Sequence, residues 1–170
     1  MANTNSLKKP YHVAVCGGGI GGLCLVIGLL HQSIPCTLYE SAPAFAEIGA
    51  GVSFGPNAVR AMCLIDPAIK KGFDRQTTSN AFPDRKSVWF DFRMGMSEEG
   101  WKSAKGENTP AREGEHIARV SGDVGQASVH RAHFLDELVR LVPDGVAEFG
   151  KRVQNVEEKG NRMQITFHDG

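Results

Sequence analysis

Blocks of apolar and polar residues along the chain predict strands and helices in alternation. An apolar run at residues 11–16 has the length and composition of a buried strand. Residues 21–31 are predicted to form an apolar helix, and residues 36–40 a second strand that ends in an acidic side chain. Because strand–helix–strand connections within one sheet are right-handed, we expect the two strands to lie parallel and adjacent.

The next part of the chain contains glycine and proline at positions that suggest turns. Residues 48–55 hold three glycines, which indicates backbone close to a ligand or an unusual turn. Pro56 then opens a predicted helix over residues 58–65. Residues 66–67 interrupt that helix, and a short second helix is expected to end at Gly72.

The second half of the chain combines weak strand signals with one clear helix. Residues 86–93 and 116–120 are predicted strands, and the polar stretch 97–114 between them is a predicted long loop. Residues 130–142 carry apolar side chains at helical spacing. The last predicted strands are residues 146–149, parallel to the first two, and a hairpin of residues 152–157 and 163–167.

A glycine-rich turn joins the first predicted strand to its helix. Gly17, Gly19 and Gly22 have the Gly-x-Gly-x-x-Gly spacing, and Glu40 follows Gly22 by eighteen residues. In a dinucleotide-binding βαβ unit these glycines permit a tight turn, close approach of a pyrophosphate and close helix–strand packing. The helix N-terminus attracts the phosphates, and the acid accepts hydrogen bonds from a ribose. A 2′-phosphate would be repelled by that acid, so FAD or NAD fits better than NADP.

Composition is that of an ordinary globular chain. The 170 residues carry 19 basic and 19 acidic side chains, so no basic excess indicates a nucleic-acid partner. The six histidines form no triad or metal-ligand spacing, and no metal site is predicted. The four cysteines lie in apolar runs and form no Cys-x-x-Cys pair, so we expect small buried side chains in a reducing, cytoplasmic compartment. These are Cys16, Cys24, Cys36 and Cys63.

Residues 13–30 also allow a membrane alternative. These eighteen residues lack charge and follow Lys8 and Lys9, as in a signal peptide or a marginal transmembrane span. Six of the eighteen are glycine, which weakens an isolated helix. No membrane span is therefore expected.

Three segments together resemble a known family. They are residues 13–40, residues 47–52 with 56–60, and His130-Arg131 at the head of the later helix. In this order they resemble the amino-terminal part of class A flavoprotein monooxygenases, specifically the salicylate hydroxylase-like aromatic hydroxylases. The resemblance implies a Rossmann-like α/β FAD-binding fold, with a parallel sheet plus a β-hairpin or meander, in truncated form. The polar start of the chain predicts a disordered segment at residues 1–10, and the resemblance implies a partial FAD-binding domain at residues 11–170, without the substrate domain.

The resemblance also implies a cofactor and the residues that hold it. FAD would be reduced by NAD(P)H and would use O₂ to hydroxylate a small aromatic substrate such as salicylate or a phenol. By family analogy, the glycine turn holds the pyrophosphate and Glu40 the ribose. Ala50 and Gly51 lie along the cofactor through their backbone, and the Arg131 guanidinium reaches toward it.

The chain departs from the family pattern in two respects. Ser41 stands where many relatives carry arginine, so one contact to the adenosine side is in doubt. The chain ends before the family's later Gly-Ala-Asp-Gly strand and turn, so no catalytic residue can be named and the chain alone is expected to be inactive. A missing carboxyl-terminal segment is a possible partner, and we expect exposed apolar edges where it would pair.

Two alternatives remain open from the sequence. The glycine turn and Glu40 also suit an NAD-dependent Rossmann oxidoreductase, although no catalytic Tyr-x-x-x-Lys is present. A catalytically inactive remnant that only binds a nucleotide is the second alternative.

Overall fold

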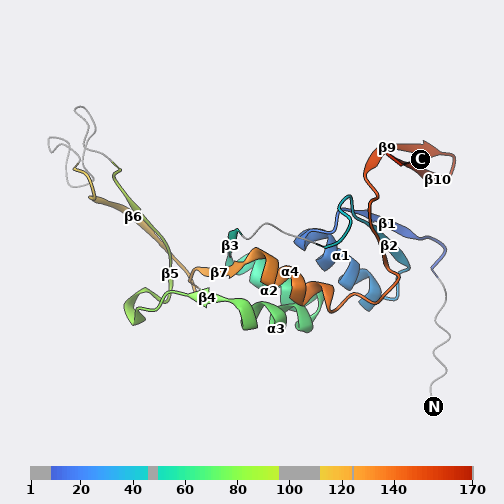
Figure 1. Ribbon diagram of the computed structural model, residues 1–170. Helices are drawn as coiled ribbons and strands as arrows, with labels where there is room; N and C mark the ends of the chain where they lie inside the picture. Colours follow the sequence, from blue (N-terminus) through green and yellow to red (C-terminus); the bar gives the residue numbers. More distant parts are fainter. Residues whose placement is uncertain (1–8, 46–49, 96–111, 124, 170) are drawn as a thin grey trace, which may run out of the picture. The chain divides into compact units, whose positions relative to one another are not determined.

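The chain forms two compact units (Figure 1). The computed structural model describes residues 9–45, 50–95, 112–123 and 125–169. Within these, the first unit takes residues up to Val52, residues 60–76 and the chain from Val129 onward, and the second takes residues 53–59 and 77–128. The predicted disorder at residues 1–10 falls almost entirely outside the described residues.

A three-stranded parallel sheet forms the framework of the first unit. Strand β1 (Val13–Cys16) pairs in parallel with β2 (Cys36–Tyr39), from Val13 opposite Cys36 to Cys16 opposite Tyr39. Strand β8 (Ala147–Glu148) pairs in parallel with the other edge of β2, which gives the order β1-β2-β8. The predicted parallel sheet is confirmed, although β1 begins two residues later than the apolar run suggested.

Helix α1 (Ile20–His31) connects β1 to β2 and supplies much of the core. Leu23 and Val26 are fully buried, as is Leu38 of β2. Burying an aliphatic side chain of this size stabilises a fold by about 1.5–3 kcal/mol. Burial of these side chains of α1 and β2 therefore contributes much of the stability of the first unit. Across the described residues, no helix is both long enough and apolar enough to cross a membrane.

Two further helices pack against each other in the first unit. Helix α3 (Pro67–Gln76) meets α4 (Arg131–Val139), with the Phe73 and Phe134 rings edge to face at 5.5 Å. The prediction that Gly72 ends its helix was wrong. Gly72 lies buried within α3, where a Cβ would come 3.0 Å from the Glu137 Cβ. A glycine chosen for close helix packing looks the same in sequence as a glycine that stops a helix.

Helix α2 (Pro56–Ile65) begins at proline, as predicted, and spans the boundary between the units. Helix α4 begins one residue later than predicted and ends at Val139 rather than residue 142. His130, which the sequence assigned to the helix, instead ends a strand and caps the helix.

The second unit is mainly an antiparallel pair, β5 (Val88–Arg93) with β6 (His116–Ser121), which confirms both predicted strands. The predicted loop between them lies largely outside the described residues. Three short strands were not predicted, and they form a sheet in the order β3-β7-β4. They are β3 (Gly51–Phe54), β4 (Thr78–Ser79) and β7 (Ala127–His130), and a 3₁₀ turn covers Pro83–Arg85.

The predicted terminal hairpin is confirmed. Strand β9 (Val153–Lys159) pairs antiparallel with β10 (Arg162–Phe167), and Gly160 takes a positive φ of 63° in the turn. The hairpin is tied to the parallel sheet within the first unit. The Phe167 ring lies 4.8 Å from the Tyr39 ring, and the Lys151 N–H donates to the Glu40 carbonyl at 2.8 Å.

Glu137 of α4 is a buried carboxylate, with 4% of its surface exposed. It accepts hydrogen bonds from Arg75, from Gln76 Nε2 at 2.9 Å and from Arg140 Nη1 at 3.0 Å. The bonds from Arg75 and Gln76 lower the pKa of Glu137 to about 2, against the opposing effect of burial. The carboxylate therefore stabilises the α3–α4 contact only while it is ionised.

This cluster predicts a pH dependence of stability. A carboxyl group whose pKa is lowered by folding stabilises the fold above its unfolded pKa, about 4.3, and that contribution disappears as pH falls toward 2. Between pH 6 and pH 3 we expect the urea midpoint of the native chain to fall by about 1 M more than that of Glu137→Gln. Glu158→Gln, at an exposed position on β9, is the control and should behave like the native chain. Equal midpoint changes in all three proteins would contradict the assignment.

Candidate functional site

The glycine turn between β1 and α1 requires its glycines at two positions. Gly17 has φ of +105°, which side chains on L-residues rarely permit. A Cβ at Gly22 would lie 1.9 Å from the Gly17 carbonyl oxygen, so no side chain fits there. The Gly17 N–H donates to the Tyr39 carbonyl at 2.8 Å and so holds the turn at the carboxyl ends of β1 and β2.

The head of α1 is suited to bind an anion. Gly19 is the N-cap residue and no side chain caps the helix, so the first amide groups are not satisfied by a capping side chain. The Arg131 guanidinium lies close by, since a Cβ at Gly19 would be 3.9 Å from Arg131 Nη2. A helix N-terminus and a guanidinium both favour negative charge, and together they suit the oxygens of a phosphate.

Glu40 follows β2 and faces this turn. Its Oε2 accepts a hydrogen bond from the Gly18 N–H at 2.6 Å. Its Oε1 accepts from the Ala42 N–H at 2.8 Å and from the Ser41 hydroxyl at 3.1 Å. Partial burial would raise the pKa of Glu40, but these bonds, led by Ala42 and Gly18, lower it below its usual value. The side chain is therefore an ionised hydrogen-bond acceptor at the head of α1.

Gly18 also belongs to the site, although the motif spacing does not single it out. A side chain there would meet the Phe45 ring at 2.7 Å and Glu40 Oε2 at 2.9 Å. Phe45 in turn packs edge to face on Phe149, with ring centroids 4.8 Å apart. The uninterrupted run of three glycines was the sequence signal for this position.

The other predicted site residues are Arg131 at the start of α4, and Ala50 and Gly51 where the chain enters β3. The Arg131 N–H donates to the Ala50 carbonyl at 2.9 Å, so the backbone that leads into β3 contacts the residue whose side chain reaches Gly19. Gly51 follows as the first residue of β3, with open space where a Cβ would be. Of the second family segment, residues 47–49 lie outside the described residues. Contact with the cofactor stays a prediction for all seven of the predicted site residues.

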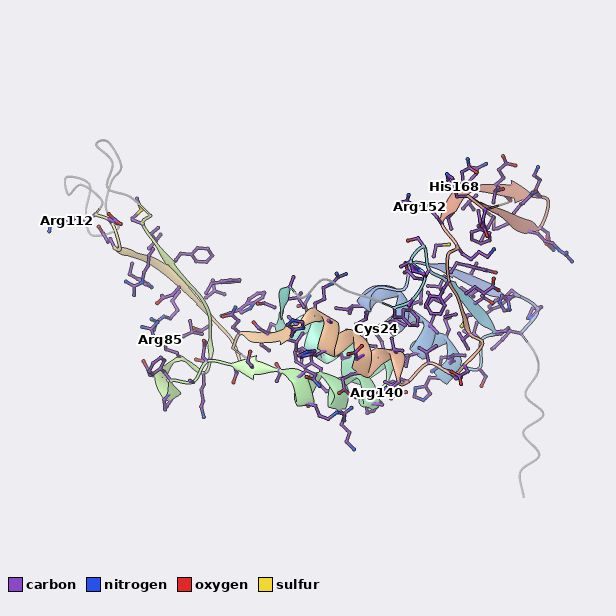
Figure 2. The ribbon with its side chains drawn as sticks, in the orientation of Figure 1. Cys24, Arg85, Arg112, Arg140, Arg152 and His168 are labelled. Atoms are coloured by element: carbon purple, nitrogen blue, oxygen red, sulfur yellow. The ribbon has the colours of Figure 1, made fainter. Side chains whose placement is uncertain are left out.

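A small cationic hollow adjoins the turn and was not predicted. It has a volume of about 230 Å³, and its lining includes Gly17, Ser41, Lys151 and Arg152. Lys151 Nζ pairs with Asp169 at 2.6 Å, which raises the pKa of the lysine. Figure 2 labels Arg152 beside His168, whose N–H donates to the Arg152 carbonyl at 2.9 Å. Lys151 and Arg152 belong to the link between β8 and the hairpin, which is distant in sequence from the glycine turn.

The prediction that the cysteines are buried was half wrong. All four are free thiols, but Cys16 and Cys63 are exposed. Cys24 on α1 (Figure 2) is partly buried, and burial raises the pKa of its thiol to about 11, which keeps it protonated. Among the described residues, no group of three or more His, Cys, Asp or Glu side chains could hold a metal ion.

The glycine turn predicts opposite outcomes for neighbouring substitutions. Gly22→Ala forces a Cβ into the Gly17 carbonyl, and we expect a loss of at least about 3 kcal/mol in unfolding free energy. Gly21→Ala is the matched control on the same helix, because nothing lies within 4 Å of its Cβ position. It should be neutral or stabilise by up to about 1 kcal/mol. Chemical unfolding of both variants tests the packing, and similar losses in the two would contradict it.

Comparison with known proteins finds longer relatives that are similar to this chain. No family model matches the chain. The chain is 44% identical over 163 residues to 6-methylsalicylate 1-monooxygenase atA of Aspergillus terreus, covering 93% of this chain and 34% of that protein. It is 37% identical over 171 residues to a salicylate hydroxylase of Pseudomonas putida, covering all of this chain and 35% of that protein.

Solved structures agree with the sequence relatives. A salicylate hydroxylase substrate complex superposes with a TM-score of 0.69 at 30% identity, over 96% of this chain and 33% of that one. A Klebsiella pneumoniae HpxO variant complexed with FAD superposes with a TM-score of 0.63 at 25% identity, over 94% and 36%. The chain spans about a third of the length of these relatives. Over that third, the chain is similar to proteins named salicylate hydroxylase and FAD-dependent monooxygenase.

Proposed function

We propose that this chain is the FAD-binding portion of a flavin-dependent monooxygenase that hydroxylates a small aromatic substrate of the salicylate or phenol class. The observation that carries the proposal is the ionised Glu40 carboxylate beside the Gly18 amide at the head of α1. A ribose acceptor and a phosphate-binding helix end adjoin there, as a dinucleotide requires.

Each part of the site would meet a different part of the cofactor. The amides at the start of α1 and the Arg131 guanidinium would bind the diphosphate oxygens. Glu40 would accept hydrogen bonds from the adenosine ribose, and the chain at Ala50 and Gly51 would contact the cofactor through its backbone. A bound flavin supplies the redox chemistry, with NAD(P)H as reductant and O₂ as oxidant. We assign none of the described residues a role in the reaction between the flavin and the aromatic substrate.

Neither alternative function is favoured. The relatives are named as hydroxylases and monooxygenases, and several as FAD-dependent, rather than as NAD-dependent dehydrogenases. Free thiols at all four cysteines support the proposed cytoplasmic location, since reducing compartments keep thiols unpaired. We further propose that catalysis needs polypeptide beyond this chain, because the relatives are about three times as long.

Removing the charge of Glu40 tests the ribose contact. Glu40→Gln loses an ionised acceptor but keeps the size of the side chain, and we expect FAD to bind at least tenfold more weakly, about 1.4 kcal/mol. Quenching of flavin fluorescence during titration measures the affinity, and Glu158→Gln serves as the control for an exposed glutamate. A native chain that binds neither FAD nor ADP-ribose would contradict the proposed function.

Arg131 can be tested by a graded pair of substitutions. Arg131→Met removes the positive charge and the donors, and we expect an approximately tenfold loss of FAD affinity. Arg131→Lys keeps the charge but not the planar fork of donors, so we expect an intermediate loss. The charge contribution should shrink as salt is raised, because screening weakens it. If both variants bind as tightly as the native chain, the guanidinium does not contact the cofactor.

A further inference from the structure

The cationic hollow beside the glycine turn holds a positive charge that the cofactor contacts proposed above do not use. The hollow lies where β1 and β2 end, and its lining includes Gly17, Ser41 and Arg152 (Figure 2). In open α/β sheets, ligands bind outside the carboxyl ends of the parallel strands. The hollow is therefore at the end of the sheet where a fold of this kind receives its ligand.

The segment that leads to Arg152 is fixed to the end of β2 by backbone hydrogen bonds. The Gly150 N–H donates to the Ala42 carbonyl at 3.0 Å. The Lys151 N–H donates to the Glu40 carbonyl at 2.8 Å. Arg152 therefore follows directly on a stretch of chain that is tied to the segment bearing the proposed ribose acceptor.

The two cations of the hollow differ in their partners. Lys151 Nζ pairs with Asp169 at 2.6 Å and lies 5.5 Å from the centre of the Phe167 ring. Arg152 is exposed, and its backbone carbonyl accepts the His168 N–H. Within the described part of the chain, no residue forms an ion pair or hydrogen bond with the Arg152 guanidinium. The charge of Lys151 is thus neutralised by a neighbour, whereas no described neighbour neutralises that of Arg152.

The rest of the lining leaves space for an anion. Nothing lies within 4 Å of the position that a Cβ on Gly17 would occupy. Ser41 brings no charge to the hollow, and its hydroxyl donates to Glu40 Oε1 at 3.1 Å. An arginine guanidinium presents its donors in one planar fork that matches the oxygens of a phosphate. A guanidinium beside open glycine backbone is therefore suited to a phosphate group.

We propose that the Arg152 guanidinium binds the diphosphate of the dinucleotide, as a second cation in addition to Arg131. This inference rests on the proposed function, because it requires the nucleotide to lie at the glycine turn with its ribose on Glu40. Each phosphate of a bound diphosphate carries a negative charge, and the contacts proposed above supply a helix N-terminus and one guanidinium. Arg152 supplies a further full charge, which also offsets the repulsion between the phosphates and the Glu40 carboxylate.

A contact with the adenine base is the alternative role for the same side chain. A guanidinium also stacks on flat aromatic rings. The two contacts predict different dependence on the phosphates of the ligand. A phosphate contact contributes to the binding of ADP and not to that of adenosine, whereas a contact with the base contributes to both.

The test compares ADP with adenosine as ligands of the 170-residue chain. Arg152→Met removes the guanidinium but keeps a long, unbranched side chain. In calorimetric titrations we expect this variant to bind ADP at least tenfold more weakly than the native chain and to bind adenosine equally well. Arg152→Glu reverses the charge and should weaken ADP binding further, again without a change for adenosine. Unchanged adenosine binding also shows that each variant is folded.

Arg162→Met is the matched control, because Arg162 is an exposed arginine on β10 that does not line the hollow. It should bind both ligands as the native chain does. The difference in ADP affinity between the native chain and Arg152→Met should shrink as salt is raised, because screening weakens the attraction between the guanidinium and the phosphates.

Three results would overturn the assignment of Arg152. Equal ADP affinities of the native chain and Arg152→Met would remove Arg152 from the site and leave the proposed function intact. A loss of adenosine affinity as large as the loss for ADP would place the guanidinium against the base or in support of the fold. A native chain that binds neither ligand would overturn both this inference and the proposed function.

Discussion

The hydrogen bond from the Gly18 amide to the Glu40 carboxylate is the contact on which the candidate site depends. It joins the turn after β1 to the end of β2 and fixes an ionised acceptor at the head of α1. The bond requires close approach of the two segments, which the absence of side chains at positions 18 and 22 permits. The packing of the βαβ unit and the chemistry of the site therefore rest on the same few glycines.

The βαβ unit was predictable from sequence because its signals are local. An apolar run, a glycine turn and a terminal acid each reflect a nearby constraint, and the predicted β1, α1 and β2 agree with the structure to within two residues. The terminal hairpin was predicted for the same reason. Arg131 was found only through family resemblance, since a helix-head arginine carries no such local signal.

Several features that could not be predicted from the sequence depend on contacts between residues far apart along the chain. Gly72 is a packing position because Glu137 lies against it, and nothing near Gly72 in sequence indicates that. The short strands β3, β4 and β7 lack the apolar runs that predicted β1 and β2, which are no longer than β3 and β7. Lys151 and Arg152 reach the glycine turn only because β8 pairs with β2. Cys16 is exposed although Val15 beside it is buried, because successive side chains of β1 point to opposite faces of the sheet, and an apolar run does not show which face is covered.

The central claim is that a dinucleotide lies against the start of α1 with its ribose on Glu40. The most direct measurement is a titration of ¹⁵N-labelled chain with FAD, followed by the amide resonances of its NMR spectrum. The account predicts the largest shifts at residues 17–20, and above all at Gly18, whose amide donates to the carboxylate that would take the ribose. Unchanged resonances at these residues in the presence of saturating FAD would contradict it.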